Sequence, residues 1–137
     1  MNRDGFKRIT RIRLTETRIL LRTKHYDGAY YLCGYAVECA LKACIAKQTK
    51  RYEFPDKDKV RDSYTHKLSQ LVKLAGLQTA LELESASNPG FGVNWATVKD
   101  WSEESRYAEH SEQTARDLYA AVTSRKNGVL TWIKQYW

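Results

Sequence analysis

The stretch YDGAYYLCGYAVECALKACIAK, residues 26–47, decides the fold. Between residues 29 and 46, alanines, cysteines and other apolar residues recur with the i, i+3, i+4, i+7 spacing of a helix face. The charged residues of that span are Glu38 and Lys42, which stand four apart in the order that stabilises a helix. A helix that is apolar nearly all round must be covered by other elements. We therefore predict that this helix lies at the centre of a bundle.

The rest of the chain carries further helical patterns, and no part of it alternates as a strand does. Apolar spacing predicts helices over residues 8–24, 66–74 (capped by Thr65), 77–83, 93–104 and, in one long amphipathic stripe, 115–136. Charge and Pro55 predict a solvated connection over residues 50–64, and Ser, Asn, Pro and Gly predict a mobile loop over residues 85–92. Together these patterns predict one all-α domain over residues 1–137, an up-and-down helical bundle of four to five main helices.

The composition restricts the classes of partner that we expect. The chain has 137 residues and a formal net charge of +7, which favours anionic partners such as RNA or a nucleotide. No apolar run approaches the roughly 20 residues that span a bilayer, so we expect no membrane partner. The basic first 13 residues lack the apolar core of a signal peptide, which predicts a cytoplasmic protein.

Three cysteines, Cys33, Cys39 and Cys44, fall within the central helix. On a helix, the outer two would stand roughly 16 Å apart, which is too far for a disulfide. No CxxC or paired Cys/His spacing is present, so the sequence predicts no zinc site and no cofactor. We expect buried, inert thiols.

Three short segments give the chain a resemblance to a known family. Residues 26–43 resemble the alanine-rich second helix of HEPN domains, in which a Glu is followed, after three residues, by Lys-Ala. Thr65–Leu68 (THKL) is similar to the family's Thr-His-x-Leu motif, and Arg106-Tyr107 to its Arg-Tyr dipeptide before the final helix. The resemblance implies a helical bundle, a homodimer and a role in nucleotide or RNA handling. It also implies a toxin–antitoxin, defence or nucleotidyltransferase-associated system, with an antitoxin or a nucleotidyltransferase as possible partner.

Catalytic members of the family are metal-independent ribonucleases with an Arg, four to six intervening residues and a His. Arg106 and His110 are the candidate pair here, although only three residues separate them. On an α-helix an i, i+4 pair would share one face. In RNA cleavage, the histidine would act as general acid or base, and the arginine would stabilise charge on the phosphorane. Arg61 and His66 form a second match with the right spacing, but they lie before the predicted helix that starts near residue 66.

The favoured hypothesis is a binding module without a strong catalytic motif. Its binding residues would be Glu38, Lys42, His66, Arg106 and Tyr107. The ribonuclease is the first alternative, and a non-catalytic helical adaptor is the second.

Each of these residues also has a structural interpretation. A carboxylate on the most buried helix needs a partner, and Arg106 and Lys42 are the candidates for Glu38. His66 could be a hydrogen-bonded residue of a first helical turn, and His110 and His25 solvated loop residues. The tyrosines and tryptophans could stack on bases, but packing in the core or at an interface is the commoner role.

Overall fold

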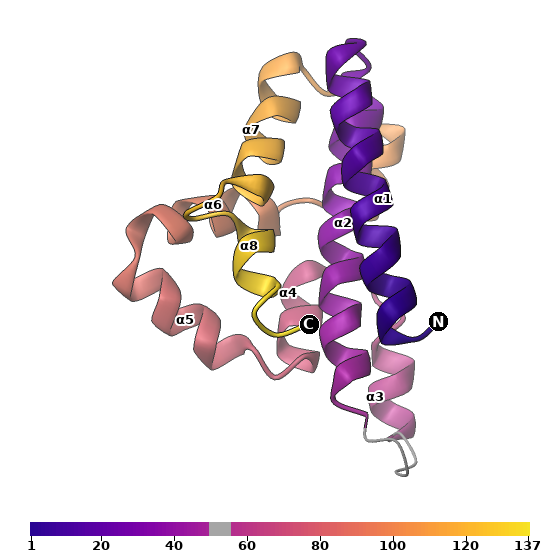
Figure 1. The fold of residues 1–137 in the computed structure, drawn as a ribbon, viewed down its shortest axis with the longest axis vertical. Helices are drawn as coiled ribbons and strands as arrows, with labels where there is room; N and C mark the ends of the chain where they lie inside the picture. The colour runs from indigo at the N-terminus through magenta and orange to yellow at the C-terminus, as the bar shows by residue number, and fades with distance from the viewer. Residues whose placement is uncertain (50–55) are drawn as a thin grey trace.

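The computed structural model describes residues 1–49 and 56–137. Two long helices, α1 (Arg3–Arg22) and α2 (Tyr26–Lys47), form an antiparallel hairpin that runs the length of the molecule (Figure 1). The turn between them contains Lys24 in the left-handed backbone region, with φ of 63°. The N-cap of α1 is Asn2, whose side chain accepts a hydrogen bond from the Gly5 amide.

The remaining helices are shorter. They are α3 (Lys57–Asp62), α4 (Leu68–Leu74), α5 (Gln78–Ser87), α6 (Pro89–Lys99), the 3-10 helix η1 (Glu103–Tyr107), α7 (Glu112–Thr123) and α8 (Val129–Ile133). Helices α1, α4, α7, α8 and η1 contact α2, whereas α5 and α6 pair on the outer side (Figure 1). Within the described residues there is no strand, and five α-helices have ten or more residues. The predicted all-α class is confirmed.

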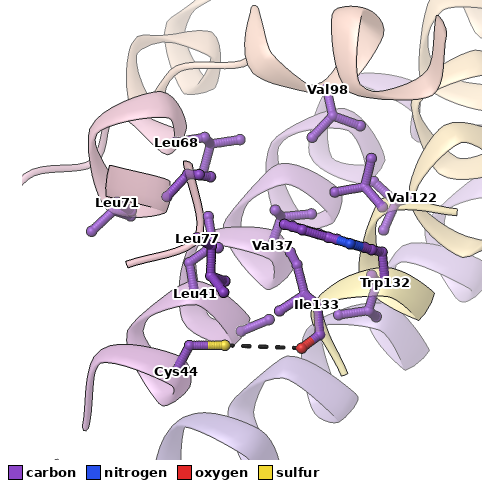
Figure 2. Packing of buried hydrophobic residues seen from close by; sticks show 14 of the residues in the cluster. Val37, Leu41, Cys44, Leu68, Leu71, Leu77, Val98, Val122, Trp132 and Ile133 are labelled. Atoms are coloured by element: carbon purple, nitrogen blue, oxygen red, sulfur yellow. Dashed lines mark hydrogen bonds between the residues drawn. The ribbon is translucent and has the colours of Figure 1, made fainter. Parts of the chain in front are cut away.

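The core is centred on α2, as its sequence predicts. Val37 and Leu41 project from α2 toward leucines of the α4 region on one side and toward Trp132 and Ile133 on the other (Figure 2). Close approach of α1 is possible because the facing residues are small, and the buried Thr10 hydroxyl lies 3.3 Å from the Ala36 carbonyl oxygen. Within the part of the chain described, no helix is long and apolar enough to cross a membrane.

Two segments predicted as connections contain helices. Residues 85–92 are not a loop, because α5 continues to Ser87 and α6 starts at Pro89. The Asn88 side chain caps α6 and proline occupies its first turn, and both are helix-start signals rather than marks of mobility. The predicted connection over residues 50–64 contains α3, which Asp56 caps; its residues 50–55 lie outside the described part.

The other predicted helices also differ from the observed ones in their bounds. The helix predicted over residues 8–24 is Arg3–Arg22, and the one predicted over residues 77–83 is Gln78–Ser87. The helix predicted over residues 66–74 begins at Leu68, and its N-cap is Lys67 rather than Thr65. The Thr65 hydroxyl accepts a hydrogen bond from the Lys67 amide, which precedes the helix. The helix predicted over residues 93–104 ends at Lys99. The long C-terminal stripe is divided into α7 and α8, and at Gly128 the added Cβ of any other residue would lie 2.3 Å from the Ser124 carbonyl oxygen. This close backbone approach explains why a glycine stands at the division.

Candidate functional site

A buried carboxylate anchors the candidate site. Glu38 lies in the middle of α2 with its side chain only 2% exposed. One carboxylate oxygen is 2.9 Å from Nδ1 of His66, and the other is 3.4 Å from Nζ of Lys42. Burying an unpaired carboxylate would cost several kcal/mol, so these two partners allow Glu38 to occupy the bundle centre.

His66 connects this carboxylate to a second element. Its other ring nitrogen, Nε2, lies 3.1 Å from a carboxylate oxygen of Glu103 in η1. The contact between Nδ1 and Glu38 is a hydrogen bond, and the contact between Nε2 and Glu103 is an ion pair when the imidazole is protonated. The His66 and Glu103 side chains are 42% and 40% exposed, so the cluster is buried at Glu38 and open to solvent at the η1 end.

The other end of η1 presents an arginine and an aromatic ring to solvent. The Arg106 guanidinium carbon lies 4.9 Å from the Tyr107 ring centroid, and Tyr107 is 80% exposed. The electrostatic interaction with Tyr107 is the main cause of a raised pKa for Arg106, followed by hydrogen bonding to the tyrosines nearby. Side chains three apart on a 3-10 helix lie in line, so Arg106 stands on the same side of η1 as Glu103.

The position of His110 is set by contacts that the sequence did not predict. The chain leaves η1 at Tyr107 and is extended at Ala108, so no α-helix connects Arg106 and His110 and the i, i+4 argument does not apply to them. The His110 ring stacks on Tyr30 of α2, with 3.8 Å between centroids, and its Nε2 lies 3.3 Å from the Ser105 carbonyl oxygen. Since a carbonyl only accepts, Nε2 donates a hydrogen in this contact.

A tryptophan fixes η1 against α2. Trp101, in the short link between α6 and η1, is buried and its indole covers Gly34 of α2. A Cβ at Gly34 would lie 2.3 Å from three atoms of the indole, so only glycine leaves room for this contact. Tyr31 stacks on the same indole at 6.0 Å and lies beside Arg106. The site residues of η1 are thus placed by packing as well as by the His66 bridge.

One family model matches the chain. The model described as "HEPN domain" covers residues 6–135, nearly the whole length. The chain belongs to the HEPN domain family. No curated protein and no solved structure matches it in the two other comparisons. Membership supports a nucleotide- or RNA-related role for the module.

The structure of this HEPN domain brings some predicted site residues together and separates others. Glu38, Lys42 and His66 form one cluster, with Arg106 and Tyr107 at the far end of the helix that the cluster anchors. The ion pair between Glu38 and Arg106 that the sequence suggested is absent from the described residues, because Lys42 and His66 take both carboxylate oxygens. His66 is hydrogen-bonded but precedes the first turn of α4.

The second Arg/His match is divided, because His66 belongs to the cluster and Arg61 is paired elsewhere. Arg61, on α3, pairs with its neighbours Asp58 and Asp62, at 3.2 and 3.7 Å, rather than with His66. Two residues in contact with the candidate site are not distinguished by the sequence: Glu103 is not predicted, and Tyr30 is predicted only as one of a group of tyrosines. Glu103 is one of several acidic residues in a charged stretch, and Tyr30 is one of four tyrosines between residues 26 and 35. Neither residue belongs to a motif that would single it out.

The thiols of the HEPN domain are buried on α2. Burial raises the pKa of Cys33 well above its ordinary value and that of Cys39 and Cys44 to about 11. A raised pKa keeps a thiol protonated and unreactive near neutral pH. Among the described residues, no group of three or more His, Cys, Asp or Glu side chains is arranged to hold a metal ion.

Proposed function

We propose that this HEPN domain is a nucleotide- or RNA-binding module whose ligand meets the surface formed by Arg106 and Tyr107. The family match carries the proposal, and the net charge of +7 supports it. The Arg106 guanidinium is exposed and offers the planar fork that pairs with phosphate oxygens. The exposed Tyr107 ring beside it offers a face on which a base can stack.

The buried cluster has a supporting role in this proposal. Glu38, Lys42 and His66 hold Glu103, and through it the helix η1 that presents the two ligand-binding side chains. A site on a five-residue 3-10 helix needs such an anchor, because a short isolated helix is only marginally stable. We therefore assign Arg106 and Tyr107 to ligand contact and the other three residues to positioning.

The biological setting follows from the family resemblance. We propose a homodimer that works in a toxin–antitoxin, defence or nucleotidyltransferase-associated system, with an antitoxin or nucleotidyltransferase as partner protein. Light scattering on the purified chain tests the dimer. Co-purification from the source cells tests the partner protein.

The binding proposal is tested by fluorescence anisotropy at low salt with a labelled RNA oligonucleotide and with a labelled nucleoside triphosphate. We expect Arg106→Ala and Tyr107→Ala to weaken binding, the latter by about 1–3 kcal/mol if a base stacks there. Lys73→Ala, which removes an exposed cation from α4, is the matched control and should bind as the unaltered chain does. Absence of binding to both ligands would refute the proposal and leave the adaptor alternative.

A metal-independent ribonuclease is the second candidate. The observation in its favour is that, among the described residues, Arg106 is not used in an ion pair, while the Tyr30 stack fixes the His110 ring. In that reaction His110 would move a proton at the ribose or the leaving oxygen, and Arg106 would stabilise the charged phosphorane.

The ribonuclease is tested by incubating the chain with RNA in the presence of a chelator. Cleavage that His110→Ala and Arg106→Ala abolish, and growth arrest on expression that they relieve, would support it. RNA that stays intact would rule it out and leave the binding proposal standing.

A further inference from the structure

A second cationic surface lies on a different part of the molecule, where α1 meets α8 and the end of the chain. Seven of the twenty residues of α1 are Arg or Lys, against two acids. Three of the cations, Lys7, Arg11 and Arg18, are spaced i, i+4 and i+11, which places them on one face of the helix. They extend over roughly 16 Å along the helix axis.

The lower part of this surface is organised around one ring. Lys7, Arg11 and Lys134 lie with their charged groups 5.0, 5.3 and 5.7 Å from the centroid of the Trp137 ring. The ring is itself buried, and cation–π attraction holds the three charges near it. Within residues 1–49 and 56–137, none of the three forms a salt bridge. Three like charges are therefore concentrated around one ring.

A cleft of about 300 Å³ continues the surface between α1 and α7–α8. Its polar lining includes Arg18, Lys134 and Tyr119, and among the described residues no acidic side chain lines it. Lys134 lines the cleft and also lies over the Trp137 ring, so the cleft and the cation cluster share this side chain. We call the cleft and the cluster together the groove.

We propose that this groove binds the sugar–phosphate backbone of RNA, independently of base sequence. The inference rests on the proposed function, because it takes RNA as the ligand of the domain. A row of cations about 16 Å long matches several successive phosphates, which follow one another at about 3.4 Å of rise per strand in a helical nucleic acid. Release of counterions from these phosphates drives the binding.

The geometry of the groove favours a nucleic-acid strand over a single nucleotide or an anionic membrane. A single nucleotide is too short to engage the row from Lys7 to Arg18. An anionic membrane would be held by exposed apolar side chains beside the cations, but the apolar lining of the cleft, Leu14 and Leu130, is partly or fully buried. The groove contacts phosphates without reading bases, so single-stranded DNA of the same sequence should compete about equally with RNA.

The test measures the affinity for a labelled 12-nucleotide RNA by anisotropy at several salt concentrations. Lys134→Gln and Arg18→Gln should each weaken binding roughly threefold to tenfold and lower the slope of log K against log salt by about 1. Arg8→Gln, one position from Lys7 and exposed on another face of α1, is the matched control and should leave affinity and slope unchanged. Circular dichroism verifies that each variant is folded.

The outcomes separate the groove from the proposed site on η1. If the Arg18→Gln/Lys134→Gln double variant keeps the affinity and slope of the unaltered chain while Arg106→Ala loses binding, the groove inference is wrong and the proposed function survives. If no form binds RNA or nucleotide, both fail. Binding to anionic vesicles, with none to RNA, would overturn the inference in favour of a lipid surface. A smaller slope of log K against log salt in the groove variants supports the inference.

Discussion

Replacing Gly34 by alanine should destabilise this HEPN domain, although alanine is the better helix former. The added Cβ would lie 2.3 Å from three indole atoms of Trp101, whereas carbon atoms in contact prefer about 3.5–4.0 Å. The ring must therefore retreat by about 1.2–1.7 Å from α2. Trp101 is buried and connects α6 to η1, so its retreat strains both the core and the candidate site.

Overpacking of this kind costs about 1–3 kcal/mol. If the indole leaves the core altogether, the loss approaches the roughly 3–5 kcal/mol of removing a buried tryptophan. The higher helix propensity of alanine offsets up to about 1 kcal/mol of this. Gly28→Ala is the matched control, because it lies on the same helix and its Cβ would meet a single Leu20 methyl carbon at 3.3 Å.

Urea unfolding followed by circular dichroism measures both variants. We expect Gly34→Ala to be less stable than Gly28→Ala by about 1–3 kcal/mol. In a Trp101→Ala background the difference should disappear, because the clashing ring is gone. Equal stability of the two alanine variants, or an undiminished cost of Gly34→Ala without the indole, would refute the account of how η1 is docked.

Two further results should follow from the buried groups of α2. His66→Ala removes a hydrogen-bonding partner from the buried Glu38 and should lower the free energy of unfolding, measured in urea titrations, by about 1–3 kcal/mol. The control is His25→Ala, an exposed histidine, which should change the free energy of unfolding by less than about 0.5 kcal/mol. Equal unfolding curves for the two variants would contradict the bridging role of His66. Burial raises the pKa values of Cys39 and Cys44 to about 11, so these thiols keep their protons at pH 8. They should therefore not react with a chromogenic disulfide reagent until the chain is unfolded. Rapid reaction of the folded chain, seen as release of the coloured thiolate, would contradict this prediction.

The sequence predicts more of the fold than of the candidate site. The spacing of apolar residues predicts the central helix to within a few residues, and it predicts α1 and α7 as amphipathic partners. It fails at residues 85–92, where composition typical of loops coincides with helix-start signals at Asn88 and Pro89. It also fails along the C-terminal stripe, because periodicity persists across the division at Gly128.

The candidate site shows the same limit at the level of single residues. That Glu38 needs partners follows from its place on a buried helix, and Lys42 follows from helix geometry, since both lie on α2. His66 stands 28 positions away from Glu38, and Glu103 is more distant still. The sequence offered Arg106 as an equally reasonable partner.

The sequence by itself determined that this chain is a helical HEPN domain with a polar pair inside its central helix. Those features depend on residue spacing within one helix, which the chain fixes locally. Only the tertiary structure decided that His66 bridges Glu38 to η1, that Arg106 remains on the surface, and that cations of α1 meet Lys134 in a groove. These depend on how separate helices dock, and docking is settled by packing between distant residues such as Trp101 and Gly34.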